Sequence, residues 1–111
     1  MTTPAAPVVE RADEKNRYEI LVDGELVGLA AYLDRGAQRV FYHTEINDAF
    51  SGKGLAARLV QHALTDTRDN GKRIVPVCPY VAKFVKKHDE FDDATDRVTP
   101  EILNWLREEL D

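Results

Sequence analysis

The sequence predicts a mixed α/β domain: an antiparallel strand meander, a glycine loop, an amphipathic helix, a crossover strand and an additional C-terminal helix. Three observations lead to this fold class. The first half of the chain consists of runs rich in β-branched and aromatic residues, separated by turn dipeptides. After Gly54 the spacing of the apolar residues changes from that of a strand to that of a helix. A short apolar run follows the helical segment, which implies a crossover back to the sheet.

The composition limits the classes of protein to consider. A chain of 111 residues can form one core, and we expect a flexible N-terminal tail over residues 1–7 and a single domain over residues 8–111. No secretion signal and no apolar run long enough to span a membrane is evident, so we expect a cytoplasmic protein without membrane contact. A net charge of −5 argues against nucleic-acid binding, which needs a basic surface. We expect a monomer or a weak homodimer.

Four strands are expected before the glycine loop. Residues 8–11 can form an edge strand. Residues 18–22 and 25–33 flank an Asp-Gly dipeptide, which tolerates the positive φ angles of a tight hairpin turn. A second turn at residues 34–37 leads to residues 38–46, which are rich in β-branched and aromatic side chains. The result is an antiparallel meander.

A helix is expected between Gly54 and the Asn-Gly dipeptide at residues 70–71. Its apolar side chains share one face, which should pack on the sheet. These side chains belong to Leu55, Leu59, Val60, Ala63, Leu64 and Thr67. Residues 73–77 then form a short strand, whose Pro76 is best tolerated at a sheet edge or a bulge.

The last third of the chain predicts two further helices. Residues 80–88 form the first, and Thr99 followed by Pro100 begins the second, with threonine as its cap. Its apolar stripe comprises Ile102, Leu103, Leu106 and Leu110, with Trp105 at the flank. The acidic residues 89–96 between these helices predict an exposed loop.

The glycine loop before the long helix is a candidate phosphate site. The first N–H groups of a helix lack intrahelical partners, and the helix dipole favours anions at this end. Gly52 and Gly54 would let a phosphate approach the backbone, and Lys53 adds a positive charge. An ordinary strand-to-helix turn fits the loop equally well. A dinucleotide fingerprint does not fit, because four strands precede it, and a P-loop would need serine or threonine where Gly54 stands.

Strands, glycine loop, amphipathic helix and crossover strand in this order resemble the GNAT superfamily of acyl-CoA-dependent N-acetyltransferases. The segments HTEI, GKGLAARLV and CPYVAKFVKKHDEF resemble the minimal single-domain branch called YjdJ-type. The likeness covers about residues 18–91. It implies a GNAT-like fold, acetyl-CoA as the cosubstrate, and an amine acceptor that is a small molecule or part of a protein.

The resemblance also implies how coenzyme A binds. Its pyrophosphate would accept hydrogen bonds from backbone N–H groups of Gly52, Lys53, Gly54, Leu55 and Ala56. The pantetheine arm would lie in a gap between strand 38–46, which includes Thr44 and Ile46, and strand 73–77. The thioester would then lie near His43, Thr44, Glu45 and Cys78. One departure is Ser51, where the superfamily usually has arginine or glutamine.

The residues themselves suggest how the chemistry is divided. Glu45 can accept the amine's proton, and His43, two residues earlier on the same strand face, can act as the base or orient Glu45. Either side chain can equally be a solvated strand residue. Tyr80 can place its hydroxyl near the sulfur leaving group or only pack. Lys83 either contacts the coenzyme phosphates or belongs to a solvated face.

Cys78 is the only cysteine, so no internal disulfide can form, as suits a reducing compartment. Its place before a helix favours a thiolate, although a lone cysteine is more often a packing residue. We expect Cys78 to shape the pocket while the amine attacks the thioester directly, as the resemblance implies. We expect no metal, because His43, Cys78 and His88 have no zinc-ligand spacing.

Two alternatives to an enzyme remain open. One is a non-catalytic module that binds CoA or another phosphate-bearing ligand. The other is an interaction protein that uses the C-terminal helix, where Trp105 and Leu106 could face a partner.

Overall fold

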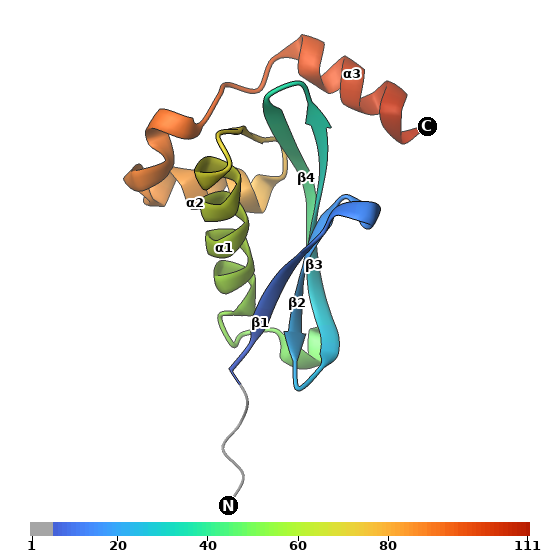
Figure 1. The fold of residues 1–111 in the computed structure, drawn as a ribbon, viewed down its shortest axis with the longest axis vertical. Coiled ribbons are helices and arrows are strands. Elements are labelled where there is room, and N and C mark those ends of the chain that lie inside the picture. The colour runs from blue at the N-terminus through green and yellow to red at the C-terminus, as the bar shows by residue number, and fades with distance from the viewer. Residues whose placement is uncertain (1–5) are drawn as a thin grey trace, which may run out of the picture.

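The computed structural model describes residues 6–111, which form a five-stranded sheet with helices on both faces (Figure 1). Residues 1–5 of the predicted tail lie outside the described part. Within the described part, no helix is long and apolar enough to cross a membrane.

The strands follow one another across the sheet in the order β1-β2-β3-β4-β5. Their bounds are Val8–Ala12 (β1), Arg17–Val22 (β2), Glu25–Arg35 (β3), Gln38–Ile46 (β4) and Arg73–Pro76 (β5). β1 to β4 are antiparallel, whereas β5 pairs with β4 in parallel. The mixed α/β fold class, with its meander and crossover strand, is therefore confirmed.

Three α-helices occur in the described residues, together with short 3-10 helices in the connections. The α-helices are α1 (Leu55–Asp69), α2 (Pro79–Lys87) and α3 (Pro100–Leu110), and the 3-10 helices are η1 (Asp13–Lys15), η2 (Asp48–Phe50) and η3 (Asp89–Ala94). Thr99 caps α3 as predicted, because its side chain accepts a hydrogen bond of 3.2 Å from the Ile102 N–H.

α1 and α2 cover one face of the sheet, while α3 lies at the end of the β3–β4 hairpin (Figure 1). All the residues predicted for the buried face of α1 are buried, namely Leu55, Leu59, Val60, Ala63, Leu64 and Thr67. They pack against sheet residues that include Tyr18, Ile20 and Phe41 to form the main core. A smaller cluster on the opposite face joins α3 to the sheet through Val40, Val75, Ile102 and Leu106.

The stripe predicted for the last helix is only partly buried. Ile102 and Leu106 face the sheet and Trp105 packs at their flank, but Leu103 and Leu110 are 41% and 51% exposed. α3 lies over one end of the sheet, so only a narrow strip of the helix finds apolar partners there. Two of the four residues of the predicted apolar stripe therefore remain open to solvent.

The acidic segment after α2 is not simply an exposed loop, which corrects the prediction made for it. It begins with η3, where Phe91 and Ala94 are buried in the main core while the carboxylates around them stay in solvent. Asp96 then accepts hydrogen bonds from Arg73 (2.7 and 2.9 Å) and Gln38 (2.9 Å). These contacts tie the segment to β4 and β5 in spite of its acidic composition.

A polar network within the sheet was not anticipated from the sequence. Arg39 is only 4% exposed and donates two hydrogen bonds to Asp34 (2.8 and 3.1 Å) and one to the Tyr18 hydroxyl (2.7 Å). Tyr18 in turn donates to Asp66 on α1 at 2.6 Å. The guanidinium also lies 4.2 Å from the centre of the Tyr32 ring. The network links β2, β3 and β4 to the helix that begins at the glycine loop.

Candidate functional site

β4 runs on past the end of its pairing with β5, toward the glycine loop, and the unpaired side of β4 that results is called the gap between β4 and β5. The two strands pair only from Gln38 with Arg73 to Phe41 with Pro76, and the Cys78 N–H donates a last bond of 2.9 Å to the Phe41 carbonyl. Residues 42–46 continue β4 without a β5 partner. The separation follows from the sequence of β5, because Pro76 has no N–H to donate and the chain turns into α2 at Pro79.

A β-bulge decides which way the β4 side chains point. Ala31 pairs with His43 while Tyr32 pairs with Phe41, so Tyr42 is an extra residue on β4. Phe41 belongs to the main core, whereas Tyr42 packs against the α3 cluster. After the bulge the alternation resumes with the opposite phase.

Thr44 and Cys78 meet on the α1 face of the sheet. The Thr44 hydroxyl lies 3.3 Å from the Cys78 sulfur, and Cys78 is 6% exposed within the main core. Cys78 is also the residue that immediately precedes α2, as predicted. The two side chains therefore lie together at the point where β4 leaves β5.

His43 and Glu45 lie on the other face of the sheet. They alternate with Thr44 and Ile46, both of which point toward the α1 side. The imidazole Nε2 is 2.7 Å from the Glu45 carboxylate, and the two side chains are 53% and 60% exposed. The four predicted catalytic residues thus do not form one cluster. Cys78 lies on one side of β4 and the His43–Glu45 pair on the other.

The glycine loop leads into α1 with backbone angles that favour glycine. Gly52 and Gly54 have φ of 77° and 74°, in the left-handed region. The first bond of α1 is donated by the Arg58 N–H to the Gly54 carbonyl at 3.2 Å. The N–H groups of the three preceding residues have no partner within the helix. The N–H groups of residues 55–57, at the start of α1, are therefore available as hydrogen-bond donors to a ligand.

A pocket of about 270 Å³ lies at the helix start. Ile46 of β4, the glycine loop and Tyr80 of α2 line it together with the first residues of α1. Of the predicted cofactor residues, those lining it are Ile46, Gly52, Gly54, Leu55 and Ala56. Lys53 is exposed beside it, with its ammonium 5.6 Å from the Phe50 ring centre. Partial burial raises the pKa of Tyr80 above its usual 10.0.

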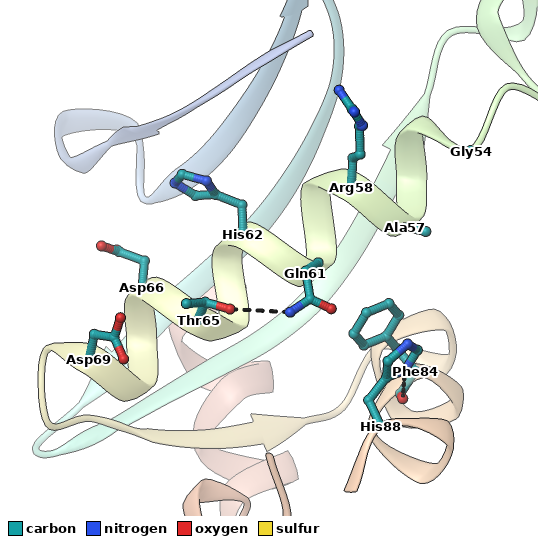
Figure 2. Close-up of a pocket in the computed structure, with 10 residues that line it drawn as sticks. All are labelled: Gly54, Ala57, Arg58, Gln61, His62, Thr65, Asp66, Asp69, Phe84 and His88. Carbon is teal, nitrogen blue, oxygen red and sulfur yellow. Dashed lines mark hydrogen bonds between the residues drawn. The ribbon is translucent and has the colours of Figure 1, made fainter. Parts of the chain in front are cut away.

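The pocket continues along the groove between α1 and α2. An adjoining hollow of about 260 Å³ shares Ala57 and Tyr80 with it and is also lined by Lys83, Phe84, Lys87 and His88. A wider hollow of about 640 Å³ runs along α1. Phe84 of α2 and His88, the residue after α2, lie at its side (Figure 2). Phe84 and His88 were not predicted from the sequence to line a binding site.

Charge in this groove is mixed, not uniformly positive. Arg58 and His62 line the wider hollow together with Asp66 and Asp69 (Figure 2). The His88 ring stacks on Phe84 with centroids 3.9 Å apart, and its Nδ1 lies 2.8 Å from the Phe84 carbonyl. Among the described residues, no group of three His, Cys, Asp or Glu side chains is arranged to hold a metal ion.

A family model described as GCN5-related N-acetyl-transferase matches residues 17–94. A search of curated protein sequences found no match. Among solved structures, the chain is similar to a GCN5-like protein from Staphylococcus aureus, with 17% identity and a TM-score of 0.63 over 84% of this chain and 91% of that one.

Two further solved structures share the fold. The ribosomal-protein-S18-alanine N-acetyltransferase from Escherichia coli has 8% identity and a TM-score of 0.55, over 69% of this chain and 53% of that one. Ard1 from Thermoplasma volcanium has 17% identity and a TM-score of 0.51, over 68% and 55% respectively. These likenesses confirm the GNAT-like fold, whereas assignment to the YjdJ-type branch stays a prediction. Because the family model extends from the start of β2 to the end of η3, the chain belongs to the GCN5-related N-acetyl-transferase family.

Proposed function

We propose that the protein is an acetyl-CoA-dependent N-acetyltransferase in which an amine attacks the thioester directly. The observation that carries this proposal is the gap between β4 and β5, which opens directly beside the glycine-loop pocket. A long, narrow cofactor with phosphates at one end and a thioester at the other fits such a pocket and gap. Family membership supports acetyl transfer in general.

The donor would bind along the α1 side of β4. Its pyrophosphate would accept hydrogen bonds from the free N–H groups at the start of α1, assisted by Lys53. Lys83 lines the adjoining hollow between α1 and α2, which suits a further phosphate contact. The pantetheine arm would bond to backbone groups of β4 between Thr44 and Ile46, because this stretch has no β5 partner.

The acceptor amine would reach the thioester from the α3 face, where His43 and Glu45 lie. In a one-step transfer the amine nitrogen forms a bond to the thioester carbon while the carbon–sulfur bond breaks. The His43–Glu45 pair would take the proton that the amine loses, because its members are 2.7 Å apart and open to solvent. Tyr80, which lines the glycine-loop pocket, would supply a proton to the departing thiolate.

Cys78 would shape the pocket without forming an acetyl-cysteine intermediate. Cys78 is buried against Thr44 and the main core, whereas the exposed His43–Glu45 pair lies on the other face of β4. A small-molecule amine or an amine on a protein would suit the open face. We also propose that the protein acts in the cytoplasm as a monomer or a weak homodimer.

Ligand binding and turnover together test this function. Thermal shifts with acetyl-CoA, CoA, NAD and ATP are measured in parallel, followed by CoA release in the presence of a panel of primary amines. A ligand at about 100 times its dissociation constant should stabilise the fold by roughly 2.7 kcal/mol, which is measurable in a domain of this size. We expect shifts with the two CoA species and amine-dependent CoA release. A shift without turnover across the panel would favour a non-catalytic binding module, and no shift with either CoA species would exclude the proposal.

A further inference from the structure

Gly28 in β3 occupies a position where no side chain fits. It pairs with Ile46 of β4 and Ile20 of β2. A Cβ atom added at Gly28 would overlap with Ile46 Cδ1 and would lie 2.8 Å from the Glu45 carbonyl oxygen and 3.1 Å from Ile20 Cγ2. Its φ lies outside the left-handed region, so space and not backbone conformation requires glycine here.

The atoms that crowd Gly28 belong to the stretch of β4 that borders the candidate donor site. Ile46 lines the glycine-loop pocket together with Tyr80, and Glu45 precedes it on the part of β4 without a β5 partner. The end of this stretch is also anchored, because the Asn47 N–H donates a bond of 2.7 Å to the Val27 carbonyl. β4 therefore cannot move away from β3 at this point without losing that bond.

We propose that Gly28 is a positioning residue for the acyl donor. Because glycine has no side chain, the Ile46 side chain can lie over Gly28 of β3. Ile46 then does not extend into the glycine-loop pocket, which stays open. A Cβ at this position would push the Ile46 side chain toward the pocket. Alternatively, it would displace the Glu45 carbonyl and with it the backbone of β4 that borders the gap. This inference rests on the proposed function, because it assumes that the pocket and gap hold acetyl-CoA.

The simplest alternative is that Gly28 matters only for packing of the core. A substitution would then lower stability without changing how folded molecules bind the donor. The two explanations can be separated because Ile46→Val removes only the Cδ1 atom, the atom that a Cβ at Gly28 would strike. The matched set is therefore wild type, Gly28→Ala, Ile46→Val and the double variant.

The experiment measures the dissociation constants of acetyl-CoA and CoA by calorimetry, with the folded fraction of each variant determined by circular dichroism. We expect Gly28→Ala to weaken donor binding by about tenfold or more in the wild-type background, as strain from overpacking would. In the Ile46→Val background the same substitution should weaken binding by only about threefold, with the remaining loss due to the Glu45 carbonyl. In steady-state kinetics, the KM for the donor should rise more than the KM for the amine.

Unchanged donor affinity of folded Gly28→Ala, or an equal loss in both backgrounds, would overturn the inference while leaving the proposed function intact. If Gly28→Ala does not fold alone, the double variant is compared with Ile46→Val. A loss of about threefold supports the inference in that comparison, and equal affinity overturns it. Failure of the wild-type protein to bind acetyl-CoA would instead overturn the proposed function, and this inference with it.

Discussion

The Thr44 hydroxyl lies 3.3 Å from the Cys78 sulfur, at the point where β4 and β5 part. The two residues are far apart in sequence, and each lies where its segment departs from regular secondary structure. Thr44 follows the bulge in β4, and Cys78 directly precedes α2. Their contact marks the inner end of the gap in which we expect the thioester to lie.

Cys78→Ala should lower the rate of acetyl transfer by about tenfold and leave amine-dependent turnover detectable, because a pocket residue affects alignment more than bond making. The measurement is the rate of CoA release for wild type, Cys78→Ala and Cys78→Ser. Intact mass after incubation with acetyl-CoA alone provides a second test. Stoichiometric acetylation of Cys78 that discharges to the amine at the turnover rate, with no activity in Cys78→Ala, would make the thiol a nucleophile.

Glu45→Gln should lower kcat by about a hundredfold at neutral pH, because general bases typically contribute that much or more. Donor affinity should stay close to wild type, since the carboxylate points away from the glycine-loop pocket. Glu10→Gln is a matched control. Glu10 pairs with Glu19, Glu19 with Leu29 and Leu29 with Glu45, so Glu10 and Glu45 share one face of the sheet. Glu10, however, lies on the edge strand β1, far from the candidate site. Wild-type kcat in Glu45→Gln would assign the proton transfer to another group.

Gly54→Ala should weaken CoA binding by about tenfold or more, because the methyl group obstructs the approach of phosphate to the backbone. Gly71→Ala is a close control at the other end of α1. Both glycines have a φ of 74° and open space around them, so the cost in backbone strain is the same. Calorimetry with CoA should show a loss for Gly54→Ala alone. Equal losses for both variants would attribute the effect to destabilisation of α1.

Asp96→Asn should reduce the acid sensitivity of the fold. Hydrogen bonds from Arg73 and Gln38 lower the pKa of Asp96 below its usual 3.8. A lowered pKa stabilises the folded state above the unfolded pKa, and this stabilisation is lost as the pH falls through the folded pKa. The melting temperature of wild type should therefore exceed that of Asp96→Asn at pH 7, by an amount that shrinks toward pH 3. Gln38→Ala, which removes one donor, should have a smaller effect of the same sign, and a difference that does not vary with pH would contradict this account.

Local patterns in the sequence determined much of the fold. The helical spacing from Leu55 to Thr67 identified the buried face of α1, and the threonine before Pro100 identified the start of α3. The glycines at residues 52 and 54 indicated the loop before α1, and both have the positive φ that such a loop needs. These predictions succeeded because periodicity, capping and turn preferences depend on residues that are close along the chain.

Which residues face one another was decided by the tertiary structure. The sequence placed His43, Glu45, Thr44 and Cys78 near one thioester. Alternation along β4 separates His43 and Glu45 from Thr44, and the bulge at Tyr42 decides that Thr44 is the one that meets Cys78. That bulge depends on the register with β3, a separate strand, and no pattern within β4 alone reveals it.

Which side chains are buried was likewise decided in part by the tertiary structure. Phe91 enters the core from an acidic segment, and Arg39 is buried because Asp34 and Tyr18 satisfy its guanidinium. In the sequence Gly28 cannot be told from any other strand glycine, and only the structure shows that the Ile46 side chain occupies the space of a Cβ there. The sequence by itself determined the elements and the loop that we assign to phosphate binding. Only the packing of distant segments decided which side chains meet, because that depends on strand register and on partners far along the chain.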